Sequence, residues 1–353
     1  MKLRIFAILM ALTLLLGTLV ACGGQNTDVH VFYYTFSDTY VSSVRSTLGT
    51  KLRDAGFGYQ DYDGNGNQTT QTEQIRTAIT KGAKVLLVNI VNTGSDDAAK
   101  EIVALAKDAN IPLLFFNREV SDSVISSYEK CAYVGTRAEE AGMLQGEMIG
   151  EYLTANFDKA DLNKDGVISY ILFKGEEGNN EAIYRTKYSV EKANELLVAA
   201  GKKPLRFYDA SNPSGYHVDQ NGQWSSAAAN DYMTTALASY NAAGNNMIEL
   251  VICNNDSMAE GAISALNAAG YNKGGDSPTI PVFGVDATES AKTLIKDKKM
   301  TGTVQQDAVG MAEALALLTA NAMEGKALMA GTESLPVDEA VRKIRIAYAK
   351  YLG

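Results

Sequence analysis

Residues 250–256 read Leu-Val-Ile-Cys-Asn-Asn-Asp, a short apolar run that is closed at once by three polar side chains. An apolar run without alternation is typical of a strand covered on both faces, as the strands of parallel sheets are. The same change from apolar to polar recurs at Phe116-Asn117 and at Val285-Asp286. Ligands of open α/β sheets bind beyond the carboxyl ends of the strands, so these polar residues predict a binding crevice.

These polar residues have a second interpretation, which concerns the helices expected after each strand. Asn and Asp are good N-caps, and Asp256 is the strongest candidate for that role. A residue at that place also faces the crevice, so the two interpretations can hold together.

Apolar runs alternate with helical patterns along almost the whole chain. The expected strands are 29–35, 85–91, 112–116, 132–135, 168–173, 205–208, 250–253 and 281–285. Two helices are marked by apolar residues at helical spacing, namely Val41, Val44, Leu48 and Leu52, and then Ala141, Leu144, Met148 and Tyr152. Strands separated by helices predict an α/β protein with two doubly wound parallel-sheet domains. Residues 209–222, rich in Ser, Asn, Pro and Gly, are expected to form a long loop.

The N-terminus predicts export and anchoring. Lys2 and Arg4 precede an apolar stretch shorter than the roughly 20 residues of a membrane span, as in a secretory signal peptide, here over 1–21. The closing Leu-Val-Ala-Cys22 resembles the lipobox of bacterial lipoproteins, which implies lipid attachment at Cys22 and a polar tether over 22–28. An ordinary signal peptide with a chance cysteine is the alternative.

The composition limits the classes to which the protein can belong. Hydrophobic residues make up 46% and charged residues 21%, as in a folded globular protein, and the length suits two domains. The net charge of -9 argues against a nucleic-acid partner, since phosphate binding needs a basic surface. Cys131 and Cys253 lie in apolar runs and are expected to be buried free thiols. We expect contact with the cell membrane only through the lipid anchor, on its extracytoplasmic face, either periplasmic or at the outer surface.

Eight stretches match one known family in order and spacing. They are 40–45, 115–119, 133–136, 161–166, 174–176, 254–259, 281–287 and 302–304. With them, from about Val29 to about Tyr348, the chain resembles the galactose/glucose-binding proteins of ABC sugar importers, which are type I periplasmic binding proteins. The resemblance implies two α/β domains joined by a three-strand hinge, and a monomer that binds a hexose, galactose or glucose, in the cleft and delivers it to an ABC permease. The expected domains are 28–136 with 306–340, and 137–305 with 341–353.

The resemblance places the family's sugar-binding residues on ten positions. They are Asp38, Tyr40, Asn117, Asn179, Glu181, Arg185, Trp224, Asn255, Asp286 and Gln306. Tyr40 and Trp224 would stack on the faces of a pyranose ring, and the polar side chains would bond its hydroxyl groups. Taken alone, Tyr40 could be simple packing and Arg185 a solvated charge on a helix.

Three of these positions depart from the family's pattern. Asn179 stands where the family has a histidine, Glu181 where it has an aspartate, and Gln306 where it has an asparagine. Glu181 and Gln306 keep the functional group on an arm that is one methylene longer. A hydrogen-bonding site discriminates strongly between ligands that differ in one hydroxyl, so these changes predict a shift in the preferred hexose.

Residues 161–169, Asp-Leu-Asn-Lys-Asp-Gly-Val-Ile-Ser, have the spacing of a calcium-binding loop. The expected ligands are Asp161, Asn163, Asp165, the carbonyl group of Val167, and Ser169 or a water in its place. The twelfth position is Leu172 rather than the usual glutamate, and the resemblance supplies Glu249 instead. The loop therefore predicts a structural Ca²⁺ ion, with a metal-free turn of the same sequence as the alternative.

Other classes of function are less well supported by the residues. The two histidines, His30 and His217, leave little material for a Ser-His-Asp or Cys-His device, so we expect no enzyme and no catalytic residues. A glycoside hydrolase would need only two carboxylates, and Asp38 with Asp286 leaves that alternative open. A regulator of the lac-repressor type would carry a basic helix-turn-helix where this chain has a signal peptide. A sugar sensor that signals to a chemoreceptor is a further alternative.

Overall fold

A computed structural model describes residues 27–353. The predicted signal peptide over 1–21, the predicted lipid attachment at Cys22 and most of the predicted tether over 22–28 lie outside these residues. Within the described part of the chain, no helix is long and apolar enough to cross a membrane.

The first domain is built on one mixed sheet. In spatial order its strands are β12 (Val337–Asp338), β13 (Lys343–Arg345), β5 (Cys131–Gly135), β4 (Leu113–Phe116), β3 (Val85–Val88), β1 (Thr27–Tyr33) and β2 (Gly58–Asp63). Neighbouring strands are parallel except at the β12–β13 edge. One face is covered by α2 (Thr39–Asp54) and α11 (Ala308–Met323), and the other by α3 (Gln68–Thr80), α4 (Asp97–Asp108) and α5 (Asp122–Ser126).

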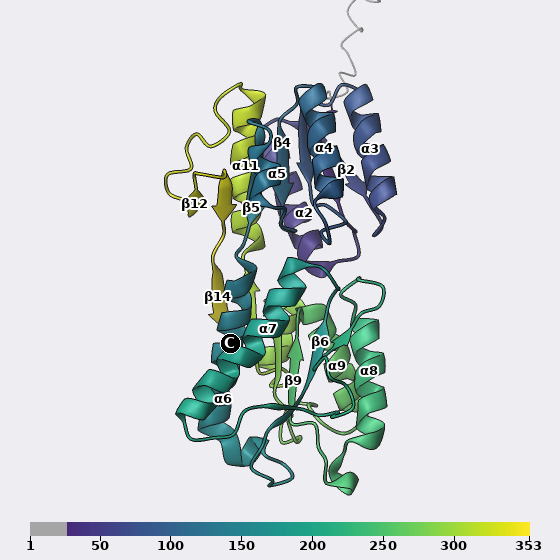
Figure 1. Cartoon of the computed structure of the whole chain (residues 1–353), viewed down its shortest axis with the longest axis vertical. Coiled ribbons are helices and arrows are strands. Elements are labelled where there is room, and N and C mark those ends of the chain that lie inside the picture. The colour runs from purple at the N-terminus through teal and green to yellow at the C-terminus, as the bar shows by residue number, and fades with distance from the viewer. Residues whose placement is uncertain (1–26) are drawn as a thin grey trace, which may run out of the picture.

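The second domain repeats this plan below the first (Figure 1). Its strands, in spatial order, are β14 (Tyr348–Tyr351), β11 (Gly302–Gln306), β10 (Val282–Asp286), β9 (Leu250–Cys253), β6 (Ser169–Lys174) and β7 (Arg206–Phe207), and β8 (His217–Val218) also pairs with β6. Only β14 runs antiparallel to its neighbour. One face is covered by α6 (Ala138–Ala160) and α7 (Asn180–Ala199), and the other by α8 (Ser226–Ser239), α9 (Asp256–Ala268) and α10 (Glu289–Lys296). The predicted two-domain α/β fold is confirmed.

The chain passes between the domains three times, from β5 to α6, from β11 to α11 and from β13 to β14. The last crossing corrects the expected boundary, because residues 341–353 were assigned to the second domain. Lys343 instead pairs with Tyr133 of the first sheet, and its buried ammonium group donates to Glu119 Oε1 at 2.7 Å. A buried lysine carries no apolar strand signal, so the sequence pattern could not place this strand.

Edge strands account for other differences from the expected strands. β2 reads Gly-Tyr-Gln-Asp-Tyr-Asp, and none of its residues is fully buried, since it closes one edge of the first sheet. The expected loop over 209–222 is largely irregular but contains β8, which is held beside Phe173 and Lys174.

Helix α6 brings helix α7, which carries part of the binding site, unusually close. Gly142 of α6 faces the backbone of α7, and a Cβ atom built there would lie 2.6 Å from the carbonyl oxygen of Tyr184 and 3.2 Å from Cα of Arg185. Gly146 meets the carbonyl oxygen of Ser189 in the same way. The absence of side chains on this face of α6 therefore sets the position of Arg185.

We predict that Gly142→Ala lowers the free energy of unfolding by about 1–3 kcal/mol, because the new methyl group must push α7 away. On a solvent-exposed helix face, Gly→Ala would raise the free energy of unfolding by up to about 1 kcal/mol. The sign of the change therefore tells whether α7 packs tightly against Gly142. Urea unfolding measures it. Thr154→Ala, exposed on the same helix, is the matched control and should stay within about 0.5 kcal/mol. A more stable Gly142→Ala protein would show that the contact is loose.

Candidate ligand-binding site

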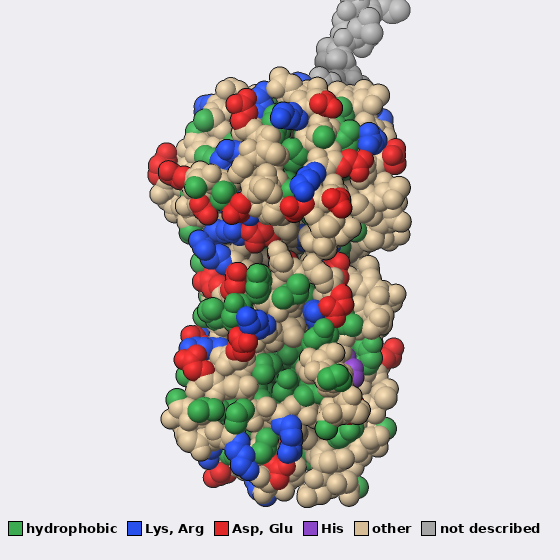
Figure 2. Space-filling model, viewed as in Figure 1, with side chains coloured by type: hydrophobic (Ala, Val, Ile, Leu, Met, Phe, Trp, Pro, Cys, Tyr) green, Lys and Arg blue, Asp and Glu red, His purple; other side chains and the backbone are tan. Residues whose placement is uncertain are grey.

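A cavity lies between the two domains, whose surfaces meet at the waist seen in Figure 2. The empty space between its lining residues, including the part open to solvent, is about 360 Å³. The structure places all ten predicted binding residues on its wall, together with two that were not predicted. The lining comprises Tyr34, Asp38, Tyr40, Asn117, Arg118, Asn179, Glu181, Arg185, Trp224, Asn255, Asp286 and Gln306.

The carboxyl ends of strands supply several of these residues, as the sequence predicted. Asn117 follows β4 and Asn255 follows β9, while Asp286 and Gln306 are the last residues of β10 and β11. The two sheets therefore direct their polar ends at the same cavity, one from each domain.

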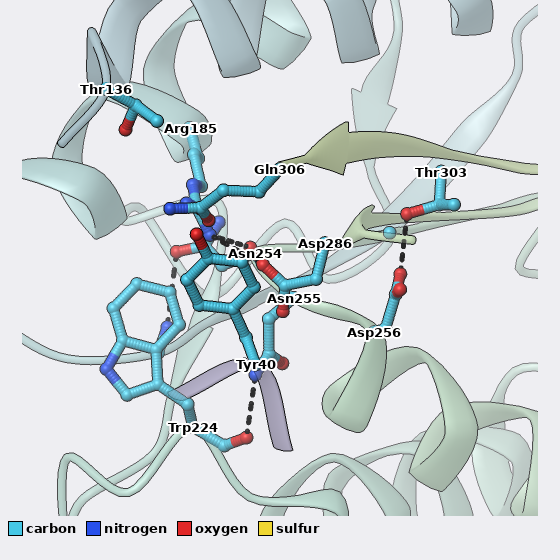
Figure 3. Close-up of polar contacts among 12 residues, drawn as sticks. Tyr40, Thr136, Arg185, Trp224, Asn254, Asn255, Asp256, Asp286, Thr303 and Gln306 are labelled. Carbon is cyan, nitrogen blue, oxygen red and sulfur yellow. Dashed lines mark hydrogen bonds and ion pairs between the residues drawn. The ribbon is translucent and has the colours of Figure 1, made fainter. Parts of the chain in front are cut away.

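Helix caps and cavity residues are in part the same residues. Asp38, Asn179 and Asn255 each accept a hydrogen bond from a backbone N–H group in the first turn of α2, α7 and α9. The interpretation of Asp256 as the N-cap is wrong, because Asn255 caps α9. The Asp256 carboxylate instead accepts from the Thr303 hydroxyl at 2.6 Å and from the Thr288 N–H group at 2.8 Å, which ties β11 and the β10–α10 loop to α9 (Figure 3).

The two predicted aromatic residues are held by quite different means. Tyr40 is buried in the first turn of α2, and its hydroxyl group lies 3.6 Å from the sulfur of Met311. Trp224 adopts a φ of 56° and packs its ring on Gly175, where a Cβ atom would lie 2.0 Å from the indole. The buried Asp219 fixes the turn before α8 by accepting from the N–H and hydroxyl groups of Ser225.

Three residues on the cavity wall have a positive φ. Besides Trp224, Asn117 has a φ of 58° and Asp286 a φ of 127°. Asn tolerates the left-handed region, but Trp and Asp rarely adopt such values. Conformations of this kind persist where the surrounding structure enforces them, which is common at binding sites.

Arg185 forms the polar centre of the site (Figure 3). Its guanidinium group donates to the carbonyl oxygen of Asn254 at 2.9 Å, to Gln306 Oε1 at 3.0 Å and to the Tyr348 hydroxyl at 3.0 Å. Asp286 Oδ1 lies 4.0 Å away. Only 3% of Arg185 is exposed, so it is not the solvated helix charge considered above.

Three buried polar atoms on the cavity wall have no hydrogen-bond partner within the protein. They are Glu181 Oε2, Arg185 Nε and Gln306 Nε2, one acceptor and two donors. An unsatisfied buried polar group costs about 1–3 kcal/mol, so few persist without a ligand or water to satisfy them. The cavity is therefore complementary to a molecule that carries both donors and acceptors.

Burial also shifts the acids of the site. It raises the pKa of Asp286 well above its usual value, although the nearby Arg185 opposes the shift. Burial likewise raises the pKa of Glu181 and raises that of Asp256 to about 7. Hydrogen bonds from a ligand's hydroxyl groups would favour the charged form of Asp286 and Glu181.

Sequence reasoning missed the residues that join the domains around this cavity. Arg118 follows the predicted Asn117 and pairs with Glu176 of the second domain. Tyr348 bonds both Arg185 and Thr136 and so connects the site to two of the crossings. Only the resemblance over 115–119 and 174–176 gave a signal for the first pair.

The predicted calcium loop comes together with Glu249. The Glu249 carboxylate accepts from the N–H groups of Leu162 at 2.7 Å and Ser169 at 2.9 Å, and Asp161 Oδ1 is buried without a partner. Asp165 forms a salt bridge to Arg206 at 2.7 Å. Among residues 27–353, no group of three or more His, Cys, Asp and Glu side chains is arranged to hold a metal ion.

Comparisons with known proteins agree on one family. The family described as "Periplasmic binding protein domain" matches residues 29–327. The D-galactose/methyl-galactoside binding periplasmic protein MglB of Haemophilus influenzae is 34% identical over 333 residues, which cover 94% of this chain and 92% of that protein.

Solved structures show the same fold. A solute-binding protein of an ABC transporter from Bacillus halodurans, with bound myo-inositol, has a TM-score of 0.70 at 22% identity, covering 94% of this chain and 96% of that one. Another from Clostridium phytofermentans, with bound β-D-glucose, also has a TM-score of 0.70, at 21% identity, covering 92% and 93%.

We predict that Asp256→Asn flattens the pH dependence of stability. The pKa of Asp256 in the folded protein is about 7, well above 3.8. Between these values the folded state keeps a proton that the unfolded state releases, so this group's contribution to stability falls as the pH rises, by up to about 1.4 kcal/mol per unit. Urea unfolding of both proteins at pH 4 to 7 measures the difference in unfolding free energy between them. A difference that does not fall with pH would contradict the prediction.

Proposed function

Since the chain belongs to the periplasmic binding protein family, whose members bind solutes outside the cytoplasm and are not enzymes, we propose that it captures a hexose, galactose or glucose, and delivers it to an ABC transporter. The observation that carries the proposal is the set of three unpartnered polar atoms on the wall of the interdomain cavity. Because members of this family are not enzymes, the alternative of a glycoside hydrolase is excluded.

A pyranose would match the chemistry of this wall. Its hydroxyl groups both donate and accept, so they can satisfy Glu181 Oε2, Arg185 Nε and Gln306 Nε2 at once. The ring of Trp224 offers an apolar plate for one face of the sugar. Each new hydrogen bond to a charged group would contribute about 1.5–3 kcal/mol, because that group is already desolvated.

The three departures from the family's pattern would decide which hexose is preferred. Asn179 donates to Thr93 Oγ1 of the first domain at 3.3 Å, and Glu181 Oε1 accepts from the Glu119 N–H group at 3.4 Å. Gln306 Oε1 already accepts a hydrogen bond from Arg185. The free ends, Glu181 Oε2 and Gln306 Nε2, are thus the atoms that would select among hydroxyl positions.

Anchoring through Cys22 is part of the proposal and suits the topology. Thr27 begins β1 at the end of the first sheet opposite the carboxyl ends that face the cavity. A lipid attached a few residues earlier would leave the cleft free to open and close. Labelling with a radioactive fatty acid, lost in Cys22→Ala, tests this attachment.

We also propose a structural Ca²⁺ ion in the loop over 161–169. The fit rests on the unpartnered Oδ1 of Asp161 and on Glu249, whose pKa is raised mainly by burial and also by the charge of Asp161. Two buried carboxylates close enough to influence each other's charge would be stabilised by a cation. Asp161, Asn163, Asp165 and Glu249 would supply oxygen ligands, and bound Ca²⁺ would fix the loop before β6.

We predict that galactose or glucose raises the melting temperature in proportion to the logarithm of its concentration, once that exceeds Kd, because the ligand binds only the folded protein. Ribose, xylose and myo-inositol complete the thermal-shift screen. Asp286→Asn should weaken binding at least tenfold, since it removes a charged acceptor from the cavity wall. Asp297→Asn, exposed at the end of α10, is the matched control. The absence of a shift with every sugar would refute the proposal.

We predict that a chelator lowers the melting temperature of the wild-type protein and that added Ca²⁺ restores it. In Glu249→Gln the chelator should have no further effect, because the closing ligand is lost. If Glu249 acts only through its hydrogen bonds to Leu162 and Ser169, the variant is destabilised but the chelator leaves the wild-type protein unchanged. That result would exclude the metal.

A further inference from the structure

One ion pair joins the two domains in the described structure. Among residues 27–353, the salt bridge between Arg118 and Glu176 is the only one whose partners belong to different domains. Arg118 lies just after β4, and Glu176 just after β6, which is separated from β14 at the hinge edge by three strands. The pair therefore bridges the cleft away from the chain crossings.

Arg118 is fixed within the first domain before it reaches across. Its guanidinium carbon lies 4.1 Å from the ring centroid of Tyr34, a residue of the same domain. Its Nη1 donates to the carbonyl oxygens of Ile90 and Val91, which follow β3. These contacts hold the cation in place, so little side-chain entropy is lost when Glu176 arrives.

Glu176 connects this cation to the predicted stacking residue. The same carboxylate oxygen, Oε2, accepts from Arg118 and from Trp224 Nε1, the latter at 3.4 Å. Burial raises the pKa of Glu176, while Arg118 opposes the shift. A carboxylate in such surroundings is stable only with a partner, and Arg118 supplies it when the domains are closed.

We propose that Arg118 and Glu176 are a latch, which holds the closed form and orients Trp224 over the bound hexose. Both are positioning residues that act through Trp224 and through closure of the cleft. The ion pair can form only when the domains meet, so it contributes to the stability of the closed form alone. The latch thus sets how long the ligand is retained, and this inference rests on the proposed function.

The experiment uses the only tryptophan of the chain, Trp224, as its probe. Stopped-flow fluorescence of the full-length protein measures association and dissociation of galactose and glucose, first for the wild type. Glu176→Gln keeps an acceptor for Trp224 but removes the charge, and Arg118→Gln removes the cation. Each should speed dissociation at least tenfold and change association less than threefold, with the ligand-free melting temperature close to that of the wild type.

Two further variants separate the latch from a general effect on folding. Arg118→Lys keeps the charge and should recover part of the retention. The double variant Arg118→Gln with Glu176→Gln should dissociate no faster than the faster single variant, because the two residues act as one unit. Glu101→Gln, which breaks the exposed Arg76–Glu101 pair within one domain, is the matched control and should leave dissociation unchanged.

The outcomes distinguish the latch from the proposed function. Wild-type dissociation rates in Glu176→Gln, or additive effects in the double variant, overturn the latch while hexose binding stands. A wild-type protein that binds neither hexose refutes the proposed function. The latch is then decided by small-angle scattering of the ligand-free protein: a larger radius of gyration in Glu176→Gln supports it, and an unchanged radius overturns it.

Discussion

The buried guanidinium group of Arg185 is the interaction on which the arrangement of the site depends. A cation removed from water must be surrounded by acceptors, and this one has acceptors just after β9, on β11 and on β14. The positive charge of Arg185 also favours the ionised form of Asp286, which burial alone would disfavour. The position of α7, set by the bare face of α6 at Gly142, decides whether these bonds can form.

Local pattern was enough to predict the interior of the fold and the place of the cavity. Apolar runs such as 250–253 are strands because only a sheet covered on both faces buries them, and a polar residue at the carboxyl end, here Asn255, then faces the crevice. Strands β2, at one edge of the first sheet, and β13, next to the other edge, escaped prediction for the opposite reason. β2 is polar because it is half exposed, and β13 is held by the buried charge of Lys343.

The pairs that act across the cleft could not be predicted from local pattern. Arg118 and Glu176 are ordinary charged residues in their own segments, and their meeting depends on how the whole domains approach one another. The same holds for Asn179, whose amide cap on α7 is visible locally while its bond to Thr93 is not. The resemblance indicated which ten residues would bind the sugar. The structure shows which of their buried polar atoms have no hydrogen-bond partner within the protein.

The three chain crossings have a consequence for how the protein comes to be folded. The first sheet is complete only when β13, near the C-terminus, adds beside β5, and all of the second domain except β14 is encoded between them. Contacts between residues so distant in sequence form slowly. Because β13 is synthesised near the end of the chain, the first domain cannot be completed early. The first domain of such a polypeptide can be completed only when the chain is nearly finished, which suits a member of a family that acts outside the cytoplasm.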